Sequence, residues 1–365
     1  MKILYGVTGE GMGHAIRSRV ILEHLFAAGH QVEVVASNRA ASFLSERFAN
    51  VHHIHGLHIV SAENRVRKGK TLWSNVKEGL QALPSQVGAY FELIEDFAPE
   101  VVISDFESWS YLYGMAHDLP VISIDNQQVM NRCTLPDEVL DGARAEFAVV
   151  KAFVKAKLPW CAHYLIATFF QPPIRKKRTT LHPPILRPEI LAAEPTPGDH
   201  LLVYQTSTDN RPLLEVLRKS GRECHIYGME RSLKEDRRDG NLVHKPFSEQ
   251  GFIDDLASSA GVIASAGFTL MGEAVHLKKP MIAIPLEGQF EQRLNARYLA
   301  YLGYGAAVEG KLDSETLARF FDSIPAYRAA LEEYEHDGNV GLFAQIDTLL
   351  DQVAAGVLTG RRIPV

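Results

Sequence analysis

Cysteine is scarce in this chain of 365 residues, and its three copies lie far apart at Cys133, Cys161 and Cys224. An odd number of widely spaced cysteines provides neither a disulfide framework nor the short ligand spacing of a zinc site. We therefore expect a protein of a reducing compartment, and we place it in the cytoplasm.

Long hydrophobic runs and an excess of positive charge are also lacking. A helix that spans a membrane needs about 18 or more apolar residues in succession, and no such run occurs. The apolar residues before Thr8 are too few for a secretory signal and are typical of a first strand. The formal net charge of −6 excludes a global basic field that would attract nucleic acid.

What the sequence does contain is a repeated alternation of apolar strands and amphipathic helices. Strands are predicted at 2–7, 31–36, 99–105, 120–125, 164–168, 201–205, 224–227, 242–247, 262–264 and 281–285. Such alternation indicates an α/β fold with mostly parallel sheets that helices cover on both faces. At roughly 100–200 residues per domain, the length suggests at least two domains.

Proline marks the expected domain boundary. Seven prolines occur between residues 171 and 198, and the strand–helix alternation restarts after them. We predict an N-terminal domain at 1–185, a linker at 186–199 and a C-terminal domain at 200–340. Residues 341–365 should form a C-terminal helix that packs near the domain interface, and a cleft should separate the two domains.

A glycine-rich turn follows the first strand, with the sequence Gly-Glu-Gly-Met-Gly-His at 9–14. Glycines let the backbone approach a ligand, and the helix behind them offers unpaired N–H groups. A dinucleotide fingerprint would need Gly or Ala in place of His14 and an acid in place of Ser37. His14 is better suited to the role of a general base, because its ordinary pKa is near neutral. The alternative is a structural turn beside a surface histidine.

Two acids stand at the carboxyl ends of predicted strands, Asp105 and Asp125. Open α/β sheets bind their ligands at this edge. A carboxylate can orient a histidine base and stabilise its imidazolium, and Asp105 is the preferred partner of His14. We assign Asp125 to the same side of the cleft. For either acid alone, capping of a helix is the alternative.

The region from 261 to 296 carries a resemblance to a known family. The segments Ser-Ala-Gly-Phe-Thr-Leu-Met-Gly-Glu-Ala at 265–274, Pro-Met-Ile-Ala-Ile-Pro at 280–285 and Glu-Gln-Arg-Leu-Asn-Ala at 291–296 resemble the donor-binding signature of GT-B glycosyltransferases. The chain is similar to UDP-sugar-dependent enzymes and to the lipid-linked GlcNAc transferase of peptidoglycan synthesis. The resemblance implies two Rossmann-like domains that face each other across an interdomain cleft. A generic nucleotide-binding half with a polar loop is the alternative.

The resemblance implies roles for three residues at the nucleoside. Phe247 matches the aromatic residue that stacks on the base, and Gln250 matches a glutamine near the base and ribose. Glu273 matches the acid that binds the ribose hydroxyls, a role that suits the two oxygens of a carboxylate.

It also implies contacts to the diphosphate and the sugar. The turn of Gly267, Phe268 and Thr269 matches one whose backbone N–H groups bind the diphosphate at a helix start. Glu291 and Gln292 match the acid–amide pair that holds the sugar hydroxyls.

Two departures from the family pattern affect these assignments. The plant enzymes have a histidine where Ser265 stands, which weakens any phosphate contact there. Two extra residues lie between Pro285 and Glu291, so Gln289 could take the sugar-binding place instead. In the second half of the chain, Ser207 follows the first strand and either contacts the diphosphate or caps a helix.

The histidines between Val51 and His58 have no acid or cysteine beside them to complete a site, and we expect no metal. Two basic stretches, Arg65–Lys70 and Arg175–Arg178, are either solvated loops or contacts for an acceptor that carries phosphate. Such an acceptor would be a lipid-linked intermediate at an anionic membrane surface or a nucleic acid, and a small molecule is the remaining class. Peripheral contact with the inner face of the membrane would follow from the first.

The function expected from these features is transfer of a sugar from a nucleotide-sugar, with a UDP-sugar as the expected donor, to an acceptor hydroxyl. The acceptor-side loop of Gly11, Met12 and Gly13 leads to His14, which removes the proton during an in-line attack that inverts the anomeric centre. The helix start at 267–269 meets the diphosphate charge, so no cofactor or metal is required. The alternatives are a sugar-nucleotide epimerase on the same fold and a non-catalytic protein that binds nucleotide-sugars.

Overall fold

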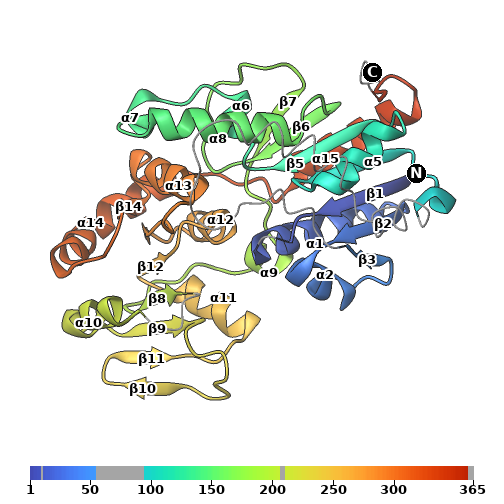
Figure 1. Cartoon of the computed structure of the whole chain (residues 1–365). Coiled ribbons are helices and arrows are strands. Elements are labelled where there is room, and N and C mark those ends of the chain that lie inside the picture. Colours follow the sequence, from blue (N-terminus) through green and yellow to red (C-terminus); the bar gives the residue numbers. More distant parts are fainter. Residues whose placement is uncertain (10, 55–93, 206–209, 361–365) are drawn as a thin grey trace.

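The computed structural model describes residues 1–9, 11–54, 94–205 and 210–360 and contains two sheets of seven strands each (Figure 1). The first sheet has the order β3-β2-β1-β4-β5-β6-β7 and the second the order β10-β11-β9-β8-β12-β13-β14. Each sheet draws its strands from one half of the chain, which confirms the predicted class of two Rossmann-like α/β domains.

All strand pairs in the first sheet are parallel. Its central strands are buried on both faces, which explains their continuous apolar sequences. The final strand, which was not predicted, follows a basic stretch and has only one buried residue, so it has no apolar run to reveal it. The strands are β1 (Lys2–Val7), β2 (Gln31–Ala36), β3 (Val51–His53), β4 (Val101–Asp105), β5 (Val121–Asp125), β6 (His163–Ala167) and β7 (Thr179–His182).

The helices of the first half largely follow the predicted pattern. The helical segment before β6 is divided in two near Gly142, whose positive φ of 63° is unfavourable for other residues. The first helix starts at Met12, so His14 lies in its first turn. The described helices are α1 (Met12–Ala27), α2 (Asn38–Ser45), α5 (Ser108–Ala116), α6 (Val129–Arg132), α7 (Asp137–Leu140) and α8 (Arg144–Lys157).

The second sheet is parallel except for an edge hairpin. The first strand of that hairpin reads Arg-Arg-Asp and is fully exposed, so its sequence gives no sign of a strand. The strands are β8 (Leu201–Tyr204), β9 (Cys224–Tyr227), β10 (Arg237–Asp239), β11 (Leu242–His244), β12 (Gly261–Ala264), β13 (Met281–Ala283) and β14 (Gly305–Ala307).

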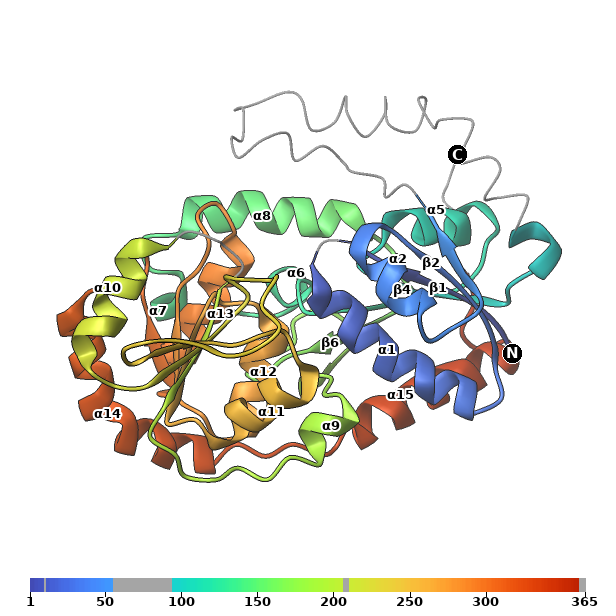
Figure 2. The same cartoon turned by 90° about the horizontal axis from the view of Figure 1, so that it is seen from below.

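The last helix of the chain returns to the first half. His24 on α1 bonds through Nε2 to Asp347 at 2.8 Å, and its ring stacks on Phe343 at 4.2 Å. Figure 2 shows α15 running beside α1. The helices from the linker onward are α9 (Pro188–Leu191), α10 (Arg211–Ser220), α11 (Glu249–Ser258), α12 (Phe268–His276), α13 (Phe290–Tyr301), α14 (Ser314–Glu332) and α15 (Val340–Ala354).

Aromatic side chains join the two halves. The ring of Phe169, which follows β6, stacks on Phe268 of α12 with centroids 5.9 Å apart. The neighbouring Phe170 stacks on Tyr298 of α13 at 3.6 Å. These contacts bring the carboxyl ends of the central strands of both sheets to a common junction. Of the helices in the described ranges, none is long and apolar enough to cross a bilayer.

Candidate active site

The predicted pair of His14 and Asp105 is brought together by neighbouring strands. Val7, the last residue of β1, is in register with Asp105, the last residue of β4. The chain turns from β1 into α1, and this places His14 Nδ1 2.7 Å from Asp105 Oδ1. The carboxylate is 0% exposed, whereas the histidine side chain is 13% exposed. The imidazole is therefore the member of the pair that a substrate can reach.

A third residue, Arg17, completes this cluster and was missed in the sequence. Its Nε donates to Asp105 Oδ2 at 2.8 Å, and its Nη2 donates to Asp105 Oδ1. Ser18 Oγ also donates to Asp105 Oδ2, at 2.9 Å. Arg17 and Ser18 lie three and four residues after His14 and therefore share its face of α1. That spacing was the available signal.

The charges of the cluster fix the protonation states. Burial alone would raise the pKa of Asp105, but Arg17 and then His14 outweigh it and hold that pKa well below its usual range. Burial lowers the pKa of His14, and the Arg17 charge lowers it further, against the opposing effect of Asp105. At neutral pH the site therefore holds an ionised carboxylate beside a neutral imidazole.

Asp125 has a structural role in the turn before α6. Its Oδ1 accepts from the backbone N–H of Gln128 at 2.7 Å, and its Oδ2 accepts from Ser123 Oγ at 2.6 Å. These bonds shape the turn and are not a helix cap, because the N-cap residue of α6 is Gln128 and that helix has no side-chain capping bond. Burial raises the pKa of Asp125 to about 6.

The glycine-rich loop lies directly against the start of α12. A Cβ atom on Gly13 would lie 2.6 Å from Thr269 Oγ1, so only glycine allows this approach. Gly11 has a φ of 89°, which glycine adopts at no steric cost. Between them, Met12 is partly buried and packs against the core. The predicted acceptor-side loop and diphosphate-binding turn thus meet, although they are about 250 residues apart in sequence.

The first turn of α12 is available to an anion. Gly267 is its N-cap residue and makes no side-chain capping bond, and the space beside its Cα is open. The first N–H groups of a helix have no partner within the helix. Asn295 on α13 steadies the turn by donating to the Ala266 carbonyl at 3.4 Å. Because the Phe268 side chain is occupied with Phe169, only its backbone N–H can face a ligand.

Glu273, the residue predicted to bind ribose, is held by an arginine from the linker. Arg187 Nε donates to Glu273 Oε1 at 2.9 Å, and Nη2 donates to Oε2 at 3.3 Å. The same guanidinium donates to Glu249 Oε1 at 2.7 Å. Burial raises the pKa of Glu273, and the nearby charges of Glu249 and Glu189 add to this against the effect of Arg187. Arg187 was not identified from the sequence, where nothing relates it to a residue 86 positions away.

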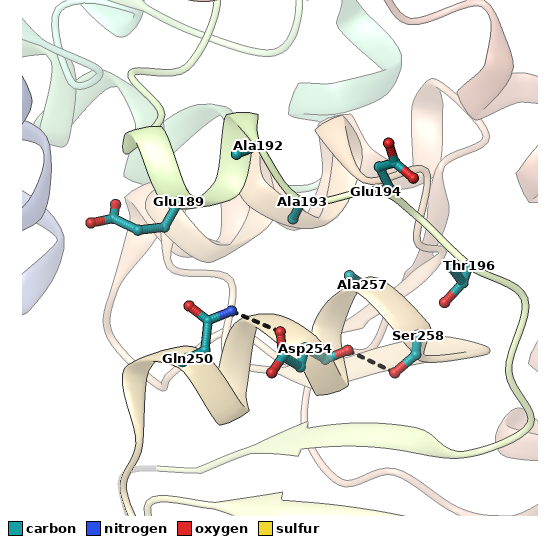
Figure 3. A pocket seen from close by; sticks show the side chains of 9 residues that line it. All are labelled: Glu189, Ala192, Ala193, Glu194, Thr196, Gln250, Asp254, Ala257 and Ser258. Carbon is teal, nitrogen blue, oxygen red and sulfur yellow. Dashed lines mark hydrogen bonds between the residues drawn. The ribbon is translucent and has the colours of Figure 1, made fainter.

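The predicted base contacts lie at the start of α11. Phe247 is 80% exposed, which leaves its ring open for stacking. Gln250 is exposed and donates through Nε2 to Asp254 Oδ1 at 2.8 Å. Both partners of that bond line a groove of about 660 Å³ between α11 and the linker (Figure 3). The rest of the lining comprises Glu189, Ala192, Ala193, Glu194, Thr196, Ala257 and Ser258.

The sugar-binding candidates separate into two positions. Gln292 Nε2 donates to Gln289 Oε1 at 2.6 Å, and Gln292 Oε1 accepts from the Leu286 N–H at 3.0 Å. These amides hold the exposed loop before α13. Glu291 is directed to the first half of the chain, where its Oε2 accepts from Gln127 Nε2 at 2.9 Å. Burial raises the pKa of Glu291, and Arg17 is the leading opposing influence.

Several predicted residues lie outside the described residues, namely Ser207, the basic stretch Arg65–Lys70, and the end of the histidine-rich segment. The second basic stretch is described, and two of its members brace α6. Arg175 Nη2 donates to the Asn131 carbonyl at 2.8 Å, and Lys176 Nζ donates to Asn131 Oδ1 at 2.5 Å.

One histidine-rich group in the described part of the chain, His200 with His225 and Asp255, has the residue types of a metal site. The two imidazoles stack with centroids 4.1 Å apart and planes 18° from parallel. A metal ion lies in the plane of each imidazole that binds it, so stacked rings cannot share one. Lys245 Nζ also lies 3.8 Å from Asp255 Oδ2 and would repel a cation. We interpret the group as a hydrogen-bonded structural cluster.

Two Rossmann-like α/β domains with mainly parallel sheets are the architecture of the GT-B class of glycosyltransferase. Solved structures share this fold. The calicheamicin glycosyltransferase CalG4 matches with a TM-score of 0.67 and 14% identity over 98% of both chains. The spinosyn rhamnosyltransferase SpnG, solved with thymidine diphosphate, matches with a TM-score of 0.63 and 17% identity over 96% of this chain and 100% of its own.

The chain belongs to glycosyl transferase family 1, whose sequence model matches residues 1–325. An uncharacterized glycosyltransferase of Methanosarcina mazei is 24% identical over 96% of this chain and 95% of its own length. A further solved structure, Phytolacca americana UGT2 with UDP-2-fluoro-glucose and pterostilbene, has a TM-score of 0.64 and 16% identity over 98% of this chain and 99% of its own. The protein is therefore an enzyme that transfers glycosyl groups.

Proposed function

We propose that this glycosyltransferase moves a sugar from a nucleotide-sugar, with a UDP-sugar as the expected donor, to an acceptor hydroxyl with inversion. The observation that carries the proposal is the contact of Gly13 with Thr269, which sets the histidine loop against the open start of α12. Two structurally similar proteins were solved with thymidine diphosphate and with UDP-2-fluoro-glucose, which supports a nucleotide-sugar donor here.

On the acceptor side, neutral His14 accepts the proton of the attacking hydroxyl, and ionised Asp105 stabilises the imidazolium that forms. The acceptor oxygen bonds to the anomeric carbon as the bond from that carbon to the diphosphate oxygen breaks. The nucleoside diphosphate leaves with the electron pair. Because attack and departure occur on opposite faces, the anomeric configuration inverts.

On the donor side, the exposed ring of Phe247 stacks on the base, and Gln250 lies beside it at the start of α11. The N–H groups at the start of α12 receive the diphosphate, so the reaction needs no metal. Glu273 receives the ribose hydroxyls. Of the three candidates for the sugar contact we favour Glu291, because Gln289 and Gln292 bond to each other.

The acceptor class stays open among lipid-linked intermediates, nucleic acids and small molecules. The described basic stretch gives little support to a phosphate-bearing acceptor or to peripheral membrane contact, because Arg175 and Lys176 both bond to Asn131. A sedimentation assay with anionic phospholipid vesicles would test membrane contact directly. Failure to co-sediment would remove that part of the proposal.

A thermal-shift screen of UDP, thymidine diphosphate, GDP and ADP sugars tests the donor. A ligand at 100 times its Kd adds about 2.7 kcal/mol to the unfolding free energy, and we expect the largest shift with UDP-sugars. NMR of the reaction product should then show an anomeric configuration opposite to that of the donor. Retention would exclude the single displacement. Isomerisation of the donor alone would favour the epimerase, and binding without turnover across acceptors would favour the non-catalytic alternative.

A further inference from the structure

The Nδ1 atom of His14 has two neighbours that compete for it. Asp105 Oδ1 and Arg17 Nη2 each lie 2.7 Å away. In a neutral imidazole, Nδ1 either donates a hydrogen bond or accepts one. Donation to Asp105 leaves Nε2 unprotonated and able to act as a base, whereas acceptance from Arg17 places the proton on Nε2. The position and charge of Arg17 therefore bear directly on the basicity of His14.

The guanidinium of Arg17 is firmly held. Its side chain is 5% exposed and spans both oxygens of Asp105. Asp125, beside α6, and Glu291, on α13, add attraction from two further elements. Arg17 therefore stays charged at every pH at which the protein is folded, and it is fixed beside the imidazole.

We propose that Arg17 is a positioning residue of the transfer reaction: by holding both oxygens of Asp105 beside His14, it keeps the imidazole neutral and sets its strength as a base. The inference rests on the proposed role of His14 as the general base. Arg17 acts through Asp105 and His14 and is not assigned a contact with substrate.

The charges that face His14 explain the effect. Asp105 at the end of β4 favours the imidazolium, while Arg17 on α1 and Lys157 at the end of α8 disfavour it. Burial also disfavours the imidazolium and lowers the pKa of His14. Without Arg17, the larger of the two opposing cationic charges would be gone and Asp105 would act more strongly on His14, so the pKa of His14 would rise. More of the histidine would then be protonated near neutral pH and unable to accept a proton.

Histidine titration by NMR tests this assignment without requiring turnover. In protein labelled with ¹³C-histidine, the variant His14→Gln identifies the His14 signal. Arg17→Met, which keeps an unbranched stem but removes the charge, should raise the pKa of His14 by about one unit or more. Arg17→Lys keeps the charge and should give a pKa near that of the unmodified protein. Arg19→Met is the matched control, because this equally buried arginine of α1 pairs with Glu23 and Glu189 instead.

An unchanged His14 pKa in Arg17→Met would overturn the proposal, as would an equal rise in Arg19→Met. If circular dichroism shows that Arg17→Met does not fold, Arg17→Gln provides the same comparison through its shorter polar side chain. The pH profile of donor turnover supplies the second readout. Its acid limb should move to higher pH in the charge-removing variant, with activity falling about tenfold per pH unit below the new pKa.

The two readouts separate this inference from the function on which it rests. If turnover in His14→Gln equals that of the unmodified enzyme, the base assignment fails, and so does the catalytic role of Arg17. His14→Gln could be inactive while neither the pKa of His14 nor the acid limb of the pH profile changes in Arg17→Met. In that case the base assignment stands and the role of Arg17 is refuted.

Discussion

Two buried carboxylates at the junction are each held by an arginine, yet their pKa values shift in opposite directions. The pKa of Asp105 is lowered, whereas that of Glu273 is raised. Asp105 accepts from Arg17 on both oxygens and also from Ser18. Among the described residues, Glu273 accepts side-chain hydrogen bonds from Arg187 alone, and Arg187 also donates to Glu249. The neighbouring charges account for the difference, because Arg17 and His14 both lower the pKa of Asp105, whereas Glu249 and Glu189 oppose the effect of Arg187 on Glu273.

The comparison shows that the cluster around Asp105 and the residues of the proposed donor site differ in how far they are organised before a substrate binds. The cluster around Asp105 is complete without substrate, as expected of groups that must be oriented before reaction. On the donor side, the Phe247 ring is exposed, α12 has no side-chain cap, and Glu273 has few donors. A ribose diol would supply the donors that Glu273 lacks, and a diphosphate would cap α12. Under the proposed function, binding of the nucleotide would therefore complete the donor side.

The largest effect is expected from Asp105→Asn, which disrupts the cluster of His14, Asp105 and Arg17. The amide cannot stabilise the imidazolium and permits the unproductive tautomer of His14, so kcat should fall about 10³-fold or more. The nucleotide Kd measured by calorimetry should stay within about threefold, because the donor side is unchanged. A kcat close to that of the unmodified enzyme would contradict the role of Asp105.

The second prediction removes Arg187, the arginine that pairs with Glu273. Arg187→Met leaves a buried, uncompensated acid and should lower the unfolding free energy by about 3 kcal/mol at pH 8. The folded protein then holds a proton that the unfolded chain releases, so stability should fall as pH rises from the ordinary pKa of glutamate to the raised one. The loss should accordingly be smaller at pH 5. Urea melts at both pH values measure this.

The double variant Arg187→Met with Glu273→Gln is the control for that experiment. It removes both charges and should recover most of the lost stability. Equal losses in the single and double variants would show that Arg187 stabilises the linker independently of Glu273.

The third prediction moves the glycine-rich loop that carries Gly13 away from the start of α12. In Gly13→Ala, the new methyl group would meet Thr269 Oγ1 at 2.6 Å and push the loop from α12. A shift of about 1 Å between base and donor can cost about 100-fold in rate, so we expect kcat to fall about 10–100-fold. Adding Thr269→Ala removes the clashing oxygen and should restore most of the activity. No recovery in the double variant would argue against this contact.

The smallest effect is expected from removal of metal ions. The open start of α12 is assigned to the diphosphate, so turnover in excess EDTA should stay within about twofold of its value in magnesium. A tenfold loss that magnesium restores would show that a cation completes the donor side instead.

The sequence predicted both sheets and the ends of their central strands, because buried parallel strands have continuous apolar runs. It also predicted that His14 pairs with Asp105, because the end of a strand and a glycine-rich turn can both be recognised from the local sequence. Arg17 was missed although its spacing from His14 places it on the same face of α1, and Arg187 was missed because its partner Glu273 lies 86 positions away and only the folded chain pairs them. The loop before α13 stayed ambiguous for the same reason, since the contact of Glu291 with Gln127 spans 164 positions.

The most direct test of the central claim compares His14→Ala and Glu273→Gln by calorimetry and turnover on the same UDP-sugar. We expect His14→Ala to retain the nucleotide Kd and lose transfer. Glu273→Gln should weaken nucleotide binding about tenfold, since one hydrogen bond to a charged group contributes about 1.5 kcal/mol or more, and it should change kcat little. Loss of nucleotide binding in His14→Ala with transfer intact would contradict the division of base and donor between the two halves.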